Sequence, residues 1–253
     1  MYTYAVKVDL GIHESQNDDR ALIGSILLTD GELSGKIDKD CLMAAVCDGV
    51  GGMAQGYRAA MTTLEMFSHL NNQNVSNMDI QNAIEEANRR VRNIQSIENL
   101  HNGLRTTIAG FYSNGEKFIV YNAGDSRVYR FRFKYLMQLS KDHSLVQDLI
   151  DMGEITAEEA RNHPEKNVIN KCIGNDESVN PRIIDMDGDY SKGDILFLCS
   201  DGVCDVVTDN EIKDIISEHK ADDDLNQCCN LIYDKAIKNG SLDNITVILV
   251  RKD

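Results

Sequence analysis

Proline, tryptophan and long apolar runs are what this sequence has least of. Its 253 residues include two prolines and no tryptophan. No stretch of about 18 apolar residues runs uninterrupted, so no membrane-spanning helix is expected, and the start MYTYAVKVDL lacks the pattern of a secretory signal. Because no linker rich in serine or glycine divides the chain, we expect one domain over residues 1–253.

Paired cysteines with metal spacing are also missing. The seven cysteines are an odd number, and no CxxC pair or Cys/His cluster has the spacing of a zinc site. Cys228 and Cys229 fall on the apolar face of a helical pattern. We therefore expect reduced core thiols and a cytoplasmic protein without membrane contact.

Basic residues are in the minority. Lysine and arginine number 26 against 41 acidic residues, which gives a net charge of −15. A polyanion would be repelled by such a surface, so nucleic acid is not an expected partner. The excess acid serves either solubility alone or the binding of cations.

The periodicity of apolar residues predicts both strands and helices. Residues 60–70 and 80–94 repeat apolar side chains at helical spacing, with a polar loop over 68–79 between them. A capping box at Thr208–Glu211 opens a further helix, and another follows around 222–238. Strands are expected at 3–9, 20–28, 41–47, 105–113, 182–187, 194–200 and 244–250, and within 117–133 on both sides of a turn at 123–126. Strands and helices in separate groups favour an α+β layered architecture with antiparallel sheets.

Acidic residues stand at the ends of several predicted strands. They lie in NDD at 17–19, CDGVGG at 47–52, GDS at 124–126 and SDG at 200–202, and at Asp243 before the last strand. One strand-end Asp-Gly is more often a simple turn than a site, but five acidic positions of this kind form a pattern. Carboxylates that converge from different strands repel one another unless hard cations neutralise them.

Mg²⁺ or Mn²⁺ suits a site built from carboxylate oxygens. Two such ions activate a bridging water and hold phosphate oxygens, so hydrolysis of a phosphoester is the chemistry that these residues favour.

These stretches resemble the PP2C-type (PPM) metal-dependent protein serine/threonine phosphatases, in their compact bacterial form. The resemblance rests on DLGIHESQNDD at 9–19, VCDGVGGMAQG at 46–56, NAGDSRVYRFR at 122–132, KGDILFLCSDGV at 192–203 and SLDNITVILV at 241–250, among others. It implies a four-layer α-β-β-α sandwich, two antiparallel sheets with antiparallel helices on the outer faces. It also implies a flap over about 142–180 beside the active site.

The metal ligands follow from the same resemblance. It implies that Asp48 bridges two Mn²⁺ or Mg²⁺ ions and that the bridging water is the nucleophile. Asp18 and the carbonyl group of Gly49 would complete the shell of one ion, and Asp201 and Asp243 would hold the other.

Other positions carry supporting or divergent roles. Asp19 would orient metal-bound water, and Asp125 would bind a possible third ion. Glu14 stands where the family has an arginine that binds the substrate phosphate, which is a reversal of charge. His13, beside it, is a candidate to pair with the phosphate or protonate the leaving group, although a solvated loop histidine is the simpler interpretation.

The predicted function is therefore hydrolysis of phosphoserine and phosphothreonine in proteins by a monomeric enzyme that opposes a serine/threonine kinase. Two alternatives stay open. An inactive pseudophosphatase that only binds a phosphoprotein is favoured by Glu14 and opposed by the full set of acids. A two-metal nuclease or nucleotidyl-transfer enzyme is opposed, for a nucleic-acid substrate, by the net charge of −15 and the lack of a basic stripe, but these features do not oppose a free nucleotide as substrate.

Overall fold

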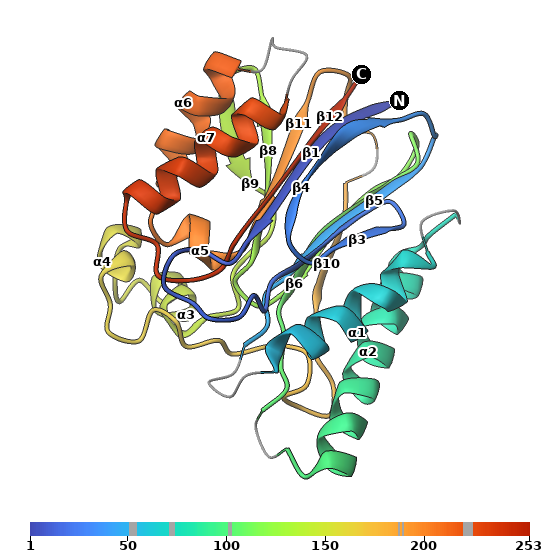
Figure 1. The fold of residues 1–253 in the computed structure, drawn as a ribbon, viewed down its shortest axis with the longest axis vertical. Coiled ribbons are helices and arrows are strands. Elements are labelled where there is room, and N and C mark those ends of the chain that lie inside the picture. Colours follow the sequence, from blue (N-terminus) through green and yellow to red (C-terminus); the bar gives the residue numbers. More distant parts are fainter. Residues whose placement is uncertain (51–54, 71–73, 101–102, 187, 189, 220–224) are drawn as a thin grey trace.

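The computed structural model describes residues 1–50, 55–70, 74–100, 103–186, 188, 190–219 and 225–253. In this part of the chain, two six-stranded antiparallel sheets pack face to face, with helices on both outer sides (Figure 1). This is the expected α+β four-layer arrangement.

The first sheet contains both ends of the chain. Its strand order is β4-β1-β12-β11-β8-β9. These strands are, in that order, Gly31–Ile37, Tyr2–Asp9, Ile245–Lys252, Ile195–Cys199, Arg127–Arg132 and Tyr135–Gln138.

The second sheet contains the strands from the middle of the sequence. Its order is β10-β7-β6-β5-β2-β3. These strands are Arg182–Asp185, Phe118–Ala123, Ile108–Ser113, Leu42–Cys47, Arg20–Ile23 and Ile26–Leu28.

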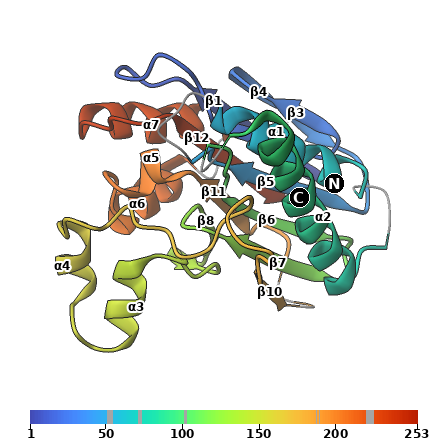
Figure 2. The same ribbon diagram turned by 90° about the horizontal axis from the view of Figure 1, so that it is seen from below.

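Long helices cover the two outer faces, and short ones lie at the strand ends. α1 (Gly56–Ser68) and α2 (Asn77–Glu98) pack on the second sheet, and α6 (Asp209–His219) and α7 (Leu225–Lys238) pack on the first. The short helices are α3 (Leu145–Asp151), α4 (Ala157–Arg161) and α5 (Asp201–Cys204), which lie near the lower end of the first sheet in Figure 1 and to one side in Figure 2.

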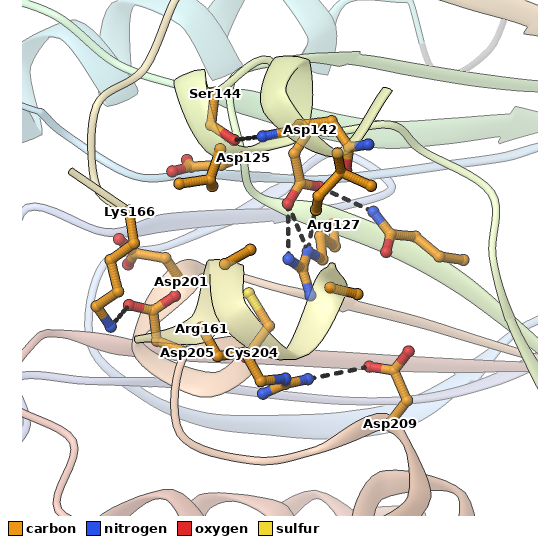
Figure 3. A pocket seen from close by; sticks show the side chains of 16 residues that line it. Asp125, Arg127, Asp142, Ser144, Arg161, Lys166, Asp201, Cys204, Asp205 and Asp209 are labelled. Carbon is orange, nitrogen blue, oxygen red and sulfur yellow. Dashed lines mark hydrogen bonds and ion pairs between the residues drawn. The ribbon is translucent and has the colours of Figure 1, made fainter. Parts of the chain in front are cut away.

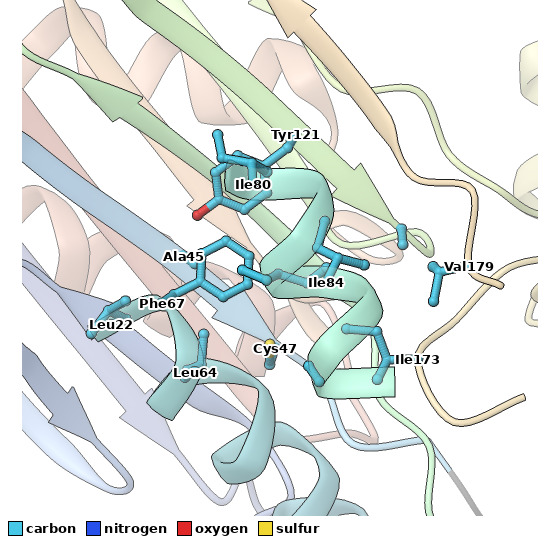
Figure 4. Close-up of a cluster of buried hydrophobic side chains, with 14 of the residues drawn as sticks. Leu22, Ala45, Cys47, Leu64, Phe67, Ile80, Ile84, Tyr121, Ile173 and Val179 are labelled. Atoms are coloured by element: carbon cyan, nitrogen blue, oxygen red, sulfur yellow. The ribbon is translucent and has the colours of Figure 1, made fainter. Parts of the chain in front are cut away.

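Apolar side chains fill all three spaces between the layers. β5 is buried along its whole length because sheet strands and α1 cover its two faces. Beneath α1 and α2, the ring of Phe67 stacks on that of Tyr121 with 5.1 Å between centroids, beside Ile80 and Ile84 (Figure 4). All seven cysteines are free thiols, as expected.

Most of the predicted elements are present with shifted ends. The capping box at Thr208 is confirmed, since its hydroxyl group accepts from the amide of Glu211 and its own amide donates to the Glu211 carboxylate. The single strand expected over 20–28 is wrong. It is a tight hairpin of β2 and β3, because Gly24 adopts a positive φ of 62° and reverses the chain. Strands β4 and β9 and the short helices α3 to α5 were not predicted.

No helix in the described part of the chain is long and apolar enough to cross a lipid bilayer.

Candidate active site

Asp48 follows β5 directly, and its backbone is held by two threonines. The carbonyl group of Asp48 accepts hydrogen bonds from the Thr106 hydroxyl group at 2.9 Å and from the Thr107 amide at 2.8 Å. The amide of Asp48 donates to the Thr107 hydroxyl oxygen at 3.0 Å. Since both backbone groups are satisfied, the backbone of Asp48 is held in place at the end of the strand.

Asp19 is buried between the two sheets' edges. Its Oδ2 accepts from the Ser200 hydroxyl group at 2.6 Å, and the Ser200 oxygen in turn accepts from the amide of Thr246 at 3.1 Å. Ser200 follows β11, so this chain of bonds ties the end of β11 to Asp19 in the other sheet.

Asp18 is held by groups from three segments. Its amide donates to Oδ1 of Asn244 at 2.7 Å, and its own Oδ1 accepts from the amide of Tyr57 at 3.1 Å and from the side chain of Gln16. Asn244 also donates to the carbonyl group of Leu10 at 2.9 Å. Asn244 thus joins the start of β12 to the turn that carries Asp18.

Asp201 and Asp243 are brought together by a close backbone approach. Asp201 is the first residue of α5, and Asp243 lies just before β12. Gly202 packs so tightly that an added Cβ would lie 2.0 Å from the carbonyl oxygen of Asn244. Only glycine fits here, and its absence of a side chain lets the two acids share one edge of the sheet.

These acids act strongly on one another. Burial raises the pKa of Asp48 well above its usual range, and the charges of Asp201, Asp19 and Asp243 raise it further. Burial likewise raises the pKa of Asp19 and that of Asp201 to about 7 in each case. The site therefore favours protonation or a bound cation at neutral pH.

The residues fit a cation-binding role. Oδ1 of Asp201 and Oδ1 of Asp125 are buried and accept no hydrogen bond from the described residues. Such orphaned carboxylate oxygens are costly unless a cation takes them up. Within the described residues no three His, Cys, Asp or Glu side chains already converge on one point. Mg²⁺ and Mn²⁺ tolerate this, because they retain several waters and need few protein carboxylates.

Asp125 lies beside this group rather than inside it. Burial raises its pKa well above the usual range, and the charge of Asp201 contributes next. The neighbouring cation does not neutralise it: Arg127 binds Asp142 through Nε and a terminal nitrogen at 2.9 and 2.6 Å. Asp125 is thus left as the acid that a further cation could reach.

Side chains between Asp142 and Lys166, within the segment for which a flap is predicted, form one wall of a pocket of about 190 Å³ that Asp125 and Asp201 also line (Figure 3). Lys166 of this segment forms an ion pair with Asp205, and Arg161 lies 4.0 Å from Asp209. Both contacts join the flap segment to the end of α5 and the start of α6.

The divergent positions lie in the turn after β1. Glu14 and His13 are both exposed, and the charge of Glu14 adds to the effect of burial in raising the pKa of Asp243. Gly11, with φ of 75°, packs against the backbone of Asp243, where an added Cβ would lie 2.4 Å from the carbonyl oxygen. The turn therefore places Glu14 beside the acids. Arg20, the cation nearest in sequence after Asp19, does not offset the charge of Glu14, since its guanidinium group donates to the carbonyl groups of Asn17 and Asp19.

Gly49 and the loop after it are only partly described. Gly49 touches Gly56 at the start of α1, where an added Cβ on Gly49 would lie 2.3 Å from the Gly56 carbonyl carbon. The amide of Val50 donates to the carbonyl group of Arg105 at 2.9 Å. The rest of the CDGVGG stretch, residues 51 and 52, lies outside the described residues.

Sequence reasoning did not single out the polar residues that position the acids. Ser200 and Asn244 each sit next to a predicted acid, Asp201 and Asp243, and this adjacency is the signal that could have found them. Thr106 has no such neighbour in the sequence, because its contact with Asp48 is made across the sheet.

His143 gives the fold a measurable pH dependence. Its Nδ1 accepts from the amide of Gly124 at 3.3 Å. Burial, assisted by the charges of Lys171 and Arg182, lowers its pKa to about 4 from 6.5. Between these values the unfolded chain binds more protons than the folded one, so stability falls as the pH drops from 6.5 to 4. We expect a loss of about 2 kcal/mol in the free energy of unfolding from this histidine.

The measurement is urea unfolding of the wild type and of His143→Gln at pH 8 and at pH 4. Glutamine retains an acceptor but does not titrate, so the difference between the two proteins isolates the histidine. An equal loss of stability in both proteins would contradict the assignment.

Comparison with known proteins agrees with the geometry of this site. A family model described as Protein phosphatase 2C matches residues 176–245. The serine/threonine phosphatase stp of Listeria monocytogenes is 31% identical over 215 residues, covering 82% of this chain and 83% of that protein. The crystal structure of the Mycobacterium tuberculosis serine/threonine phosphatase PstP/Ppp has a TM-score of 0.85 at 26% identity, covering 100% of this chain and 99% of that one. The catalytic domain of PstP in complex with 2 manganese ions has a TM-score of 0.80 at 25% identity, with 100% of each chain covered. The fold, the relatives and the acids at the strand ends, namely the acidic edge of Asp18, Asp19, Asp48, Asp201 and Asp243, agree with one another. The chain belongs to the protein phosphatase 2C family of serine/threonine phosphatases.

Proposed function

We propose that this protein removes phosphate from phosphoserine and phosphothreonine in proteins, with divalent cations held by its acidic edge. The observation that carries the proposal is the pair of buried oxygens on Asp125 and Asp201 that accept no hydrogen bond from the described residues, at a place where the charge of Asp201 also acts on Asp48. The relative with 2 bound manganese ions supports the choice of Mn²⁺ or Mg²⁺.

We propose distinct roles for the acids. Asp48, the carbonyl group of Gly49 and Asp18 would hold one ion, Asp48, Asp201 and Asp243 the other, and Asp125 a third if it binds. When bound, the cations supply a water of lowered pKa and neutralise the phosphate oxygens. Asp19, fixed by Ser200, would orient a water near Asp48 and hold its proton. Exposed His13 would be free to swing toward the leaving oxygen.

The proposal extends to the oligomeric state, the cellular location and the substrates of the protein. The whole chain would act as one monomeric domain in the cytoplasm, on phosphoproteins made by a serine/threonine kinase. Its acidic surface, with a net charge of −15, disfavours nucleic acid as substrate.

A comparison of substrates tests the proposal. Phosphate release is measured from a phosphothreonine peptide and from a free nucleotide, with EDTA, Mg²⁺ or Mn²⁺. We expect cation-dependent release from the peptide at a much higher kcat/KM than from the nucleotide. A preference for the nucleotide would overturn the substrate class, and metal binding without any release would favour a binding module.

Glu14 gives a second prediction. Because its charge faces the edge where phosphate would bind, Glu14→Arg is expected to lower KM for a phosphopeptide about five-fold, equivalent to about 1 kcal/mol. Glu116→Arg, in the exposed turn between β6 and β7, makes the same change in net charge away from the site and should leave KM unchanged. An unchanged or raised KM in Glu14→Arg would contradict the placement.

A further inference from the structure

The turn between β8 and β9 has an unfavourable backbone for its residues. Phe133 and Lys134 both have positive φ, 50° and 70°. Two-residue hairpin turns of this kind favour Asn-Gly, and a bulky side chain in the left-handed region is rare because its Cβ crowds the backbone. The sequence thus keeps phenylalanine at a position where it weakens the turn. Strain of this sort commonly marks a functional surface.

The hairpin also exposes large apolar side chains. Phe133, Tyr135 and Met137 are 85%, 77% and 45% exposed. Leu136 points the other way and packs against the apolar cluster beneath α6 and α7. Since side chains alternate along a strand, Tyr135 and Met137 share the face turned away from those helices. Three large apolar groups on one short hairpin are more than scattered exposure explains.

The charge of the hairpin is opposite to that of the chain. Residues 127–138 contain four cations and no acid, in a protein with 41 acidic residues. Arg132 pairs with Asp194, but Lys134 and the adjacent Lys192 form no ion pair with the described residues. On the β8–β9 face, Arg130 and Arg132 stand opposite Met137 and Tyr135. Because Arg130 is buried and Arg132 is paired with Asp194, the cations that this surface offers are Lys134 and Lys192, beside the exposed apolar side chains.

The backbone of β9 is open to a further strand. β9 is the last strand of its sheet, beside α6 (Figure 1), and the described residues make backbone ladder bonds to it only from β8. A groove of about 280 Å³ lies at the turn end of the hairpin, on the β11 side of β8, between Phe131–Phe133 and the turn Ser191–Asp194. An unprotected edge with apolar side chains is a template for another extended segment.

We propose that this hairpin, Arg130 to Met137, is a docking surface for an extended acidic segment of another protein. Strand pairing to β9 would supply the backbone bonds, the exposed Phe133 and Tyr135 would take apolar side chains, and Lys134 and Lys192 would attract its carboxylates. β8 starts just after Asp125 and runs away from it, so the turn at Phe133 and Lys134 lies at the end of the sheet away from the acids, whereas Gln138 at the end of β9 lines the pocket beside Asp125. This site can hold a partner while the acidic edge stays open, and it does not depend on the proposed function.

The test uses two short fluorescent peptides with identical apolar residues. One alternates Glu with Val and Tyr, and the other has Lys in place of every Glu. Fluorescence anisotropy is expected to show salt-sensitive binding of the acidic peptide and none of the basic one. The double change Phe133→Asn and Lys134→Gly gives the turn its preferred residues, so it should raise the melting temperature and weaken acidic-peptide binding about ten-fold or more.

A matched pair of variants distinguishes a specific effect of the hairpin on binding from the general effect of removing an exposed apolar side chain. Met137→Thr should weaken binding several-fold, whereas Ile26→Thr, at an equally exposed 45% on the edge strand β3 of the other sheet, should not. Absence of acidic-peptide binding, or binding unchanged by the turn exchange, would overturn the proposal. A dimer in sedimentation that the turn exchange dissociates would also overturn it, and would identify a second copy of the chain as the occupant.

Discussion

Asp48→Asn is expected to lower cation-dependent phosphate release by about 10³-fold or more and to make the metal-free protein more stable. The loss of activity follows because Asp48 is the acid on which the charges of Asp201, Asp19, Asp243 and Asp125 all act. The gain in stability follows because an amide in this place removes one of several buried like charges.

Two measurements on the same variant check this prediction. Thermal unfolding in EDTA should show a higher melting temperature for Asp48→Asn, equivalent to about 1 kcal/mol or more. Added Mn²⁺ should raise the melting temperature of the wild type by mass action and that of the variant little. A variant that is both inactive and less stable in EDTA would show a folding defect instead, and contradict the account.

Asp19 and Asp201 should give the metal-free wild type a contribution to stability with the opposite pH dependence to that of His143. Both have a pKa of about 7 in the fold against 3.8 for the free group. Between these values each binds more protons in the folded state than in the unfolded chain, so their contribution to the free energy of unfolding falls as the pH rises from 4 to 7. Bound cations should remove this dependence, because they replace the protons.

Gly202→Ala is expected to have the second largest effect. Its new Cβ would lie 2.0 Å from the carbonyl oxygen of Asn244 and 3.5 Å from Cβ of Asp243. Neither backbone segment can shift on its own. Asn244 forms hydrogen bonds with Asp18 and Leu10, and the carbonyl group of Gly202 accepts one from the Ser241 hydroxyl group at 2.7 Å. The substitution must therefore separate Asp201 from Asp243.

The expected cost has two parts. Overpacking should lower the free energy of unfolding by about 1–3 kcal/mol, and a displacement near 1 Å at the site should lower kcat/KM about 10²-fold. Calorimetric titration with Mn²⁺ should show weaker binding. Gly103→Ala is the control, because among the described residues its Cβ would meet only the Leu100 side chain, at an ordinary 3.8 Å. Equal behaviour of the two variants would contradict the role given to the close approach.

The positions of these acids could be predicted from the sequence because the end of a buried strand is visible where an apolar run stops. MAAVC and ILFLC are apolar runs in which a buried charged group would be costly, so Asp48 and Asp201 were each predicted to lie at the end of a strand. Helices at 60–70 and 80–94 followed equally from their spacing, and they lie side by side on the second sheet as expected.

The groups that hold those acids could not be predicted in the same way. The hydrogen bonds from Ser200 to Asp19 and from Thr106 to Asp48 join residues 181 and 58 positions apart, so no local sequence pattern predicts them. Strand β4 alternates half-exposed and exposed side chains and contains two glycines, so its strand signal is weak. β9 is only four residues long, which leaves too little alternation to recognise.

The measurement that tests the central claim most directly is release of inorganic phosphate from a phosphothreonine peptide as Mn²⁺ is added back to EDTA-treated protein, for the wild type and for Asp48→Asn. The account predicts that turnover appears with Mn²⁺ in the wild type and is lost in the variant. Turnover in EDTA, or Mn²⁺-dependent turnover retained by Asp48→Asn, would contradict it.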